Sequence, residues 1–172
     1  MASEPLVGAC LRMLAASKPG GRFLELGTGT GIATSWLLAG MSPGSTLISV
    51  DNDGEVQRVA KESLGEDGRL TLVTSGGLEF LRDQAAESFD FVFADAMPGK
   101  YEGLDNALAV VKLGGFYVVD DMLPQPNWPA GHADKVPVLI DKLAANPSFE
   151  ILPIVWSSGV VIAARKRSEI PS

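Results

Sequence analysis

The chain has 172 residues, of which 21 are acidic and 14 basic, so its formal net charge at pH 7 is −7. Hydrophobic residues make up 46% of it, enough to build a core, and the acidic balance argues against a dedicated binder of nucleic acid or anionic membranes. A single cysteine and a single histidine exclude an internal disulfide and a zinc site made of several Cys and His ligands.

Short apolar segments that end at turn or acidic residues are typical of buried parallel strands. In chain order they are 23–26, 46–50, 70–73, 89–94 and 115–119. Between them, apolar residues recur at spacings of three and four, which predicts helices. The helices are expected over 4–16, 32–37, 56–64, 78–85 and 104–111, and a later one contains 136–143 and starts near Pro137. In the helix over 56–64, the apolar face is predicted to be Val56, Val59, Ala60 and Leu64.

The end of the chain departs from this alternation of strands and helices. Segments 149–155 and 160–164 are separated only by Trp156-Ser157-Ser158-Gly159, and so short a connection makes an antiparallel hairpin. The predicted fold class is α/β, a doubly wound, seven-stranded Rossmann-like sheet that is mostly parallel, with one antiparallel strand from the C-terminal hairpin. We expect residues 1–172 to form one domain.

A glycine-rich segment, Glu25-Leu26-Gly27-Thr28-Gly29-Thr30-Gly31, joins the first predicted strand to its helix. Glycines let the backbone turn tightly and approach a ligand, and ligands of open parallel sheets bind at the carboxyl ends of strands. The dinucleotide-binding pattern would place its third glycine at Ile32, so the spacing disfavours a dinucleotide oxidoreductase. The plain alternative is a glycine turn with only a packing role.

This segment resembles the first motif of class I S-adenosylmethionine-dependent methyltransferases, and the closing hairpin resembles the same fold. The resemblance runs from about residue 20 to residue 165. It implies S-adenosylmethionine as the cofactor, in contact with the first motif. The implied binding residues of that motif are Glu25, Gly27, Thr28, Gly29 and Gly31.

The same resemblance implies two further cofactor contacts. Asp51 ends the second predicted strand, where the family's carboxylate accepts hydrogen bonds from both ribose hydroxyls. The alternative is a surface acid before the next helix, although Asp53 is the better helix cap. Ser75, Gly76 and Gly77 align with a family turn near the adenine, and Gly76 replaces the acid that is usual there.

Acidic residues end the fourth and fifth predicted strands, which we expect to be neighbours. Asp95 follows the fourth strand, and Asp120 and Asp121 follow the fifth. Three converging carboxylates would bind a hard cation such as Mg²⁺ or Ca²⁺, and would repel one another without a shared cation or proton. They are otherwise ordinary strand-end acids that bond the next loop. Asp95 also faces the expected position of the cofactor's positive sulfur.

The strand-end acids and the run 113–121 are similar to those of the catechol and caffeoyl-CoA type O-methyltransferases. That resemblance implies a divalent cation held by Asp95, Asp120 and Asp121, with Asp121 where the family has Asn. The family also has a lysine base three residues after its first metal-binding Asp and a Tyr six after. Here Pro98 stands at the lysine position, Lys100 is displaced to five after, and Tyr101 matches.

The segment Met122–Asp134 follows the acidic pair and is well placed to shape an acceptor pocket. Its Trp128 either stacks on an aromatic acceptor or pins the loop. His132 either acts as a base near neutral pH or only starts the next helix.

These observations predict a cytoplasmic enzyme that transfers a methyl group from S-adenosylmethionine to an oxygen of a small aromatic acceptor. The catalytic candidates are Asp95, Lys100 and His132. An RNA or protein methyltransferase, or a non-catalytic S-adenosylmethionine-binding protein, is the alternative. We expect no nucleic-acid or membrane partner, and the sequence leaves open whether the chain is a homodimer.

Overall fold

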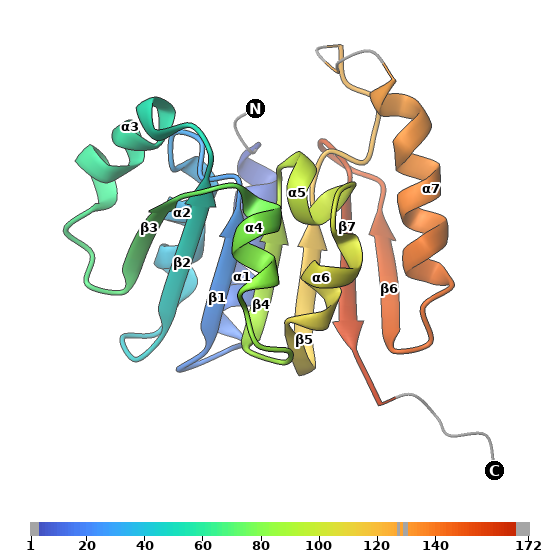
Figure 1. Ribbon diagram of the computed structural model, residues 1–172, viewed down its shortest axis with the longest axis horizontal. Coiled ribbons are helices and arrows are strands. Elements are labelled where there is room, and N and C mark those ends of the chain that lie inside the picture. The colour runs from blue at the N-terminus through green and yellow to red at the C-terminus, as the bar shows by residue number, and fades with distance from the viewer. Residues whose placement is uncertain (1–3, 127, 129–130, 168–172) are drawn as a thin grey trace.

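The strands form one mixed sheet in the computed structural model, which describes residues 4–126, 128 and 131–167 (Figure 1). The strands are β1 (Arg22–Leu26), β2 (Thr46–Asp51), β3 (Leu70–Thr74), β4 (Phe89–Ala94), β5 (Val111–Val119), β6 (Phe149–Ile154) and β7 (Val160–Arg165). Their order is β3-β2-β1-β4-β5-β7-β6. Strands β1 to β5 are parallel, and β7 is antiparallel to both of its neighbours. The predicted doubly wound sheet with one antiparallel strand is confirmed.

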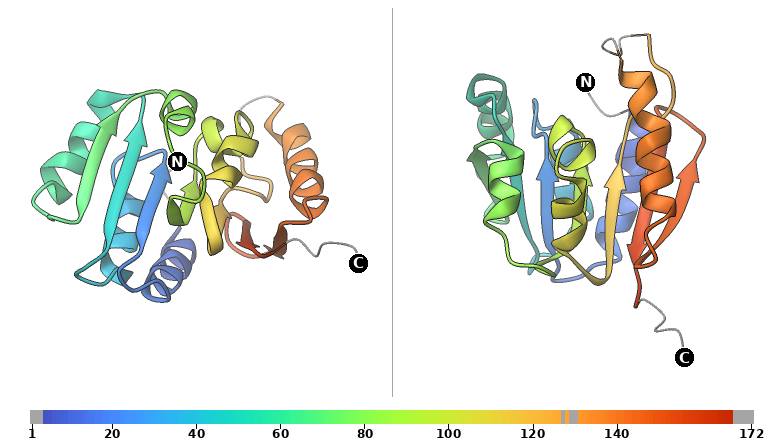
Figure 2. Two further views of the ribbon diagram at one scale, coloured as in Figure 1. Left: turned by 60° about the horizontal axis from the view of Figure 1, so that its bottom comes forward. Right: turned by 45° about the vertical axis from the view of Figure 1, so that its right-hand side comes forward.

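Helices cover both faces of this sheet. They are α1 (Pro5–Ala16), α2 (Ile32–Gly40), α3 (Gly54–Leu64), α4 (Gly77–Arg82), α5 (Met97–Lys100), α6 (Leu104–Ala109) and α7 (His132–Ala144). Helices α1 and α2 lie behind the sheet in Figure 1, and α4, α6 and α7 lie in front of it, an arrangement that Figure 2 shows from two other sides. Within the described ranges, no helix is long and apolar enough to cross a membrane.

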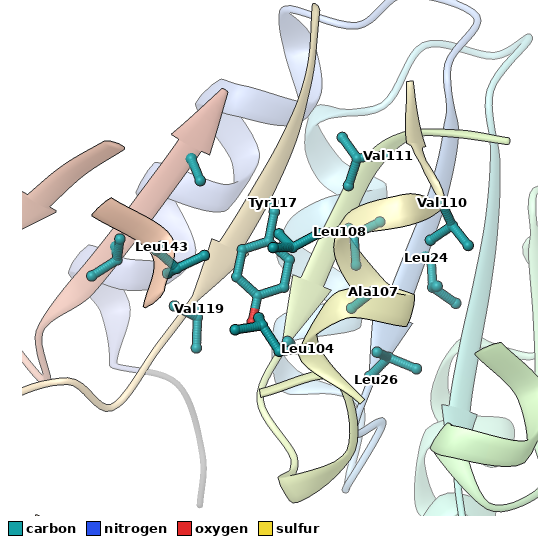
Figure 3. Packing of buried hydrophobic residues seen from close by; sticks show 14 of the residues in the cluster. Leu24, Leu26, Leu104, Ala107, Leu108, Val110, Val111, Tyr117, Val119 and Leu143 are labelled. Carbon is teal, nitrogen blue, oxygen red and sulfur yellow. The ribbon is translucent and has the colours of Figure 1, made fainter. Parts of the chain in front are cut away.

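The strands are buried on both faces, so their residues alternate between two cores. Phe23 and Phe91 face the core under α1 and α2, whereas Leu24 and Val92 face the core under α6. In the second core the Tyr117 ring lies at the centre of a group of aliphatic side chains from β1, β5, α6 and α7 (Figure 3). This packing fixes the strand ends that carry the candidate site.

Several element boundaries differ from the sequence expectations. Helix α6 ends at Ala109, and Val111 already belongs to β5. Val111 pairs with Phe89 of β4, across a register shift between Phe89 and Phe91, so the strand begins close to the end of the helix. Helix α7 begins at His132, with Pro137 inside it. Pro137 is exposed, so water can satisfy the carbonyl that its missing N–H leaves unpaired. Helix α4 ends at Arg82, not Ala85, and the short α5 was not predicted.

Candidate functional site

The glycine loop between β1 and α2 bends over the end of β2. Gly27, Gly29 and Gly31 all have positive φ angles, of 102°, 51° and 88°. The Gly27 N–H donates to the Val50 carbonyl at 2.8 Å, and the Gly29 N–H donates to Asp51 Oδ2, also at 2.8 Å. At Gly31 a Cβ would lie 2.8 Å from the Ala60 Cβ, so α3 packs directly against the loop. The conformation that glycine permits thus brings the loop backbone to Asp51.

Glu25 lies beneath this loop and is completely buried. Its Oε2 accepts hydrogen bonds from Thr34 Oγ1 and Ser49 Oγ, both at 2.5 Å, whereas its Oε1 has no partner. Burial raises the pKa of Glu25 to about 8; the two hydroxyl bonds oppose that rise, and nearby carboxylates add to it. At neutral pH the side chain is therefore mostly a neutral acid that braces the loop.

A series of hydrogen bonds from Gln57 on α3 also supports the glycine loop, and the sequence interpretation missed it. Thr28 Oγ1 is 2.7 Å from Ser49 Oγ and accepts from Gln57 Nε2 at 2.9 Å. Gln57 Oε1 accepts from Thr74 Oγ1 at 2.8 Å, which links β3 to the network. Gln57 is only 4% exposed.

The apolar face predicted for α3 is therefore partly wrong. The helix buries Ala60 and Gln57, and it leaves Val56 and Val59 exposed by 38% and 40%. Polar partners at the strand ends decide which face is turned inward. The one available signal was that Gln57 is an uncharged residue among charged neighbours, at helical spacing from Ala60.

A cavity of about 190 Å³ opens beside the glycine loop at the carboxyl ends of the strands. Asp51 lies at its edge, with Oδ1 accepting from the Asp53 N–H at 2.9 Å; Asp53 caps α3 as expected. The Ser75 N–H donates to the Asp51 carbonyl at 2.9 Å, and Gly76 is the N-cap of α4. Residues that line the cavity include Leu26, Gly27, Asp51, Gly77, Met97 and Pro98. The structure thus brings together the loop, Asp51 and the turn after β3.

A larger cavity of about 510 Å³ lies between α5, the start of α6, and α7. Met97 lines both cavities, so the two are neighbours. The larger one is mostly apolar, and its charged lining residues are Lys100, Lys135, Lys142, Glu102 and Asp134. Its lining includes Met97, Lys100, Tyr101, Leu104, Lys135 and Val138. Two ligands could bind here side by side, separated by the α5 segment.

The α5 segment is held by a hydrogen bond that the sequence did not predict. Tyr117 Oη donates to the Gly99 carbonyl at 2.8 Å from inside the core. Gly99 has φ 82°, and a Cβ there would come within 2.3 Å of Leu26 Cδ1. Burial raises the pKa of Tyr117, so its hydroxyl stays a donor. The bond fixes the turn that carries Lys100.

Lys100 reaches into the group of acids at the ends of β4 and β5. It is 3% exposed, and its Nζ donates to the Asp120 backbone carbonyl at 2.6 Å. Burial lowers the pKa of Lys100, while Asp95, Asp121 and Asp120 oppose that fall. Burial, with Asp120 adding, raises the pKa of Asp95 to about 7.

The three carboxylates do not form the expected metal site. In the described part of the chain, no group of three His, Cys, Asp or Glu side chains is placed to share a metal ion. Asp120 Oδ1 accepts from Ser158 Oγ at 2.5 Å and from the Asp121 N–H at 2.6 Å, which ties that carboxylate to protein donors. Asp121 has φ 69°, and its buried Oδ1 lacks a partner. Mg²⁺ and Ca²⁺ take six or more oxygen ligands, and no three of these side chains are placed to share an ion, so the residues as placed do not fit a divalent cation.

His132 starts α7 and is 7% exposed, with its ring between two aromatic residues. Its Nε2 is 3.0 Å from Tyr101 Oη, and its ring centroid lies 4.5 Å from that of Trp128. Burial, together with the Lys100 charge, lowers the pKa of His132, which favours neutral imidazole at pH 7. Burial raises the pKa of Tyr101, so its hydroxyl stays protonated. Residues 127, 129 and 130 of the same loop lie outside the described residues.

Comparison with known proteins finds one family and one fold. The methyltransferase domain family matches residues 24–122. Relatives from Mycolicibacterium smegmatis and Mycobacterium ulcerans, both named provisionally as O-methyltransferases, are each 37% identical over 123 residues, or 69% of this chain. The chain spans 59% and 55% of their lengths.

Two solved structures show the same fold. One is an O-methyltransferase from Bacillus cereus in complex with S-adenosylhomocysteine (TM-score 0.80, 23% identity, covering 95% of this chain and 82% of that one). The other is the O-methyltransferase TomG from Streptomyces achromogenes in complex with S-adenosylmethionine (TM-score 0.82, 24% identity, covering 96% of this chain and 82% of that one).

Proposed function

This chain belongs to the methyltransferase domain family, and from that premise we propose that it transfers a methyl group from S-adenosylmethionine to an oxygen of a small aromatic acceptor. The observation that carries the proposal is the pair of cavities that share Met97. Methyl transfer is an in-line displacement, so donor and acceptor must lie side by side in a fixed orientation. The smaller cavity is assigned to the cofactor and the larger one to the acceptor.

The cofactor contacts follow from the smaller cavity. Asp51 bonds the ribose hydroxyls, the backbone of Gly27, Thr28, Gly29 and Gly31 approaches the cofactor, and the turn at Ser75, Gly76 and Gly77 receives the adenine. Glu25 is fully buried and positions the loop through Ser49 and Thr34. Asp95 follows β4 beside Gly27 and offers negative charge to the positive sulfur. When bound, S-adenosylmethionine supplies the electrophilic methyl group.

The acceptor must lose a proton as its oxygen attacks the methyl group. His132 is buried and lies beside Tyr101, which lines the larger cavity, and its lowered pKa suits a base at neutral pH. Lys100 lines the same cavity, and its positive charge stabilises negative charge that develops on the acceptor oxygen. The Tyr101 ring, which lines the same cavity, favours an aromatic acceptor.

The same proposal covers the setting of the enzyme. We place a single catalytic domain in the cytoplasm, with a small-molecule substrate in place of nucleic acid, in keeping with the net charge of −7. Whether the chain pairs with a second copy is a question for light scattering.

Isothermal titration calorimetry with S-adenosylmethionine tests the cofactor assignment. Asp51→Asn is expected to weaken binding by about tenfold or more, which corresponds to roughly 1.4 kcal/mol. The control Asp83→Asn changes an exposed acid beyond the end of α4 and should bind like the unmodified protein. No binding to the unmodified protein would reject the proposal. With binding established, transfer of a labelled methyl group to a panel of phenols tests activity, and binding without transfer would favour the non-catalytic alternative.

A further inference from the structure

Lys100 is an unusual residue for the interior of a small protein. It is 3% exposed, and the hydrogen bond from its Nζ goes to the Asp120 backbone carbonyl, not to a carboxylate. A buried ammonium is costly unless opposite charge or several hydrogen bonds compensate it. One carbonyl bond is too little, so the compensation must come from charges near by.

Those charges are the acids at the ends of β4 and β5. Asp95, Asp120 and Asp121 all act electrostatically on Lys100. They in turn need a positive charge, because converging buried carboxylates repel one another. Two donors of the protein, the Ser158 hydroxyl and the Asp121 N–H, already bind one oxygen of Asp120. None of the three carboxylates forms a direct ion pair with Lys100 in the described residues, so the ammonium, held at the Asp120 carbonyl, acts on the group as a nearby positive charge.

We propose that the Lys100 ammonium takes the place of a divalent cation among Asp95, Asp120 and Asp121, so that methyl transfer by this chain needs no metal. The inference rests on the proposed function. Its sequence basis is the displacement of the lysine from the third to the fifth position after Asp95, on a turn that Gly99 and Tyr117 hold in place.

The replacement has a consequence for the acceptor. A divalent cation takes six or more oxygen ligands and would orient two oxygens of one acceptor. An ammonium has three donors, and Asp120 already uses one of them. The remaining donors can bind a single acceptor oxygen. The acceptor therefore needs only one reacting hydroxyl group, without a neighbouring oxygen for chelation.

The first test measures metal binding without reference to turnover. The intact protein, with and without S-adenosylmethionine, is titrated with Mn²⁺ and the free ion is followed by electron paramagnetic resonance. We expect no stoichiometric binding at micromolar Mn²⁺, and any methyl transfer found should be equal with and without EDTA. Stoichiometric micromolar binding, or transfer that EDTA abolishes, overturns the inference. Failure to bind S-adenosylmethionine would instead reject the proposed function, so the two failures are distinguishable.

The second test asks whether Lys100 and Asp95 balance each other. Lys100→Met should lower the urea midpoint of unfolding, and adding Asp95→Asn should restore at least half of that loss. The control pair combines Asp95→Asn with Lys61→Met, an exposed cation on α3, and should show additive effects. A double variant no more stable than Lys100→Met overturns the charge-replacement inference. If Lys100→Met does not fold, the Mn²⁺ titration of the unmodified protein still decides.

Discussion

Replacing Glu25 with glutamine tests whether the acid beneath the glycine loop is neutral in the folded protein. The pKa of Glu25 rises from 4.5 to about 8, mainly because the side chain is fully buried. Each pKa unit corresponds to about 1.4 kcal/mol, so ionised Glu25 is about 5 kcal/mol less favourable in the folded than in the unfolded chain. Between these two pKa values the folded protein holds a proton that the unfolded chain has lost. Stability therefore falls as pH rises, by about 1.4 kcal/mol per pH unit from this group alone.

Glu25→Gln removes that dependence and keeps an oxygen that can accept from Thr34 and Ser49. We expect the free energy of unfolding of the variant, relative to the unmodified protein, to improve by about 3 kcal/mol between pH 5.5 and pH 7.5. Urea titrations at several pH values, followed by circular dichroism, measure it. Glu66→Gln, which changes an exposed acid after α3, should show no such trend. Parallel stability profiles for Glu25→Gln and the unmodified protein would refute the reasoning, because they would mean that Glu25 is ionised in the fold.

Three further predictions concern the loop and the acceptor side. Gly31→Ala should lower the free energy of unfolding by about 1–2 kcal/mol or more, because φ is 88° and α3 leaves no room, whereas Gly68→Ala meets open space and should be nearly neutral in the same urea titration. Tyr101→Phe removes the partner of His132 Nε2. Methyl transfer should slow by about tenfold, while the calorimetric Kd for S-adenosylmethionine stays unchanged. Equal rates for the variant and the unmodified protein would exclude the pair from catalysis. The pKa of Asp95 is about 7, so binding of the cationic cofactor should release protons near pH 7 and should tighten as pH rises. Binding of S-adenosylhomocysteine should show neither effect. Identical calorimetric proton release for the two ligands would place Asp95 away from the sulfur.

The sheet and much of the cofactor side could be predicted because their signals are local. Buried parallel strands are continuous apolar runs, and each run ends where the chain must turn back over the sheet. Asp51 could be placed at the cavity from its position at a strand end alone. The hairpin of β6 and β7 followed from a connection too short for a crossover. None of these inferences required knowing which side chains meet across the fold.

The remaining features depend on contacts between segments far apart in the sequence. The periodicity of α3 gave Val56 the same weight as Ala60, but the buried face was decided by polar partners of Gln57 on other elements. The bond between Tyr117 and Gly99 joins residues 18 positions apart, and it helps to fix the turn that carries Lys100. The placement of the three strand-end acids could not be predicted for the same reason, because spacing shows that acids end adjacent strands but not where their oxygens point.

Three ionisable groups with displaced pKa values lie at one edge of the sheet. Glu25, Asp95 and Lys100 each have a pKa displaced mainly by burial, so the charged form of each is less favourable in the fold than in water. Such a cost is usual where charge must respond to a ligand. In the proposed reaction, a sulfonium enters beside Asp95 and leaves as a neutral thioether, which would change the local charge by one unit. An acid with a pKa of about 7 and an ammonium within the same group can absorb that change by moving one proton, without moving the backbone.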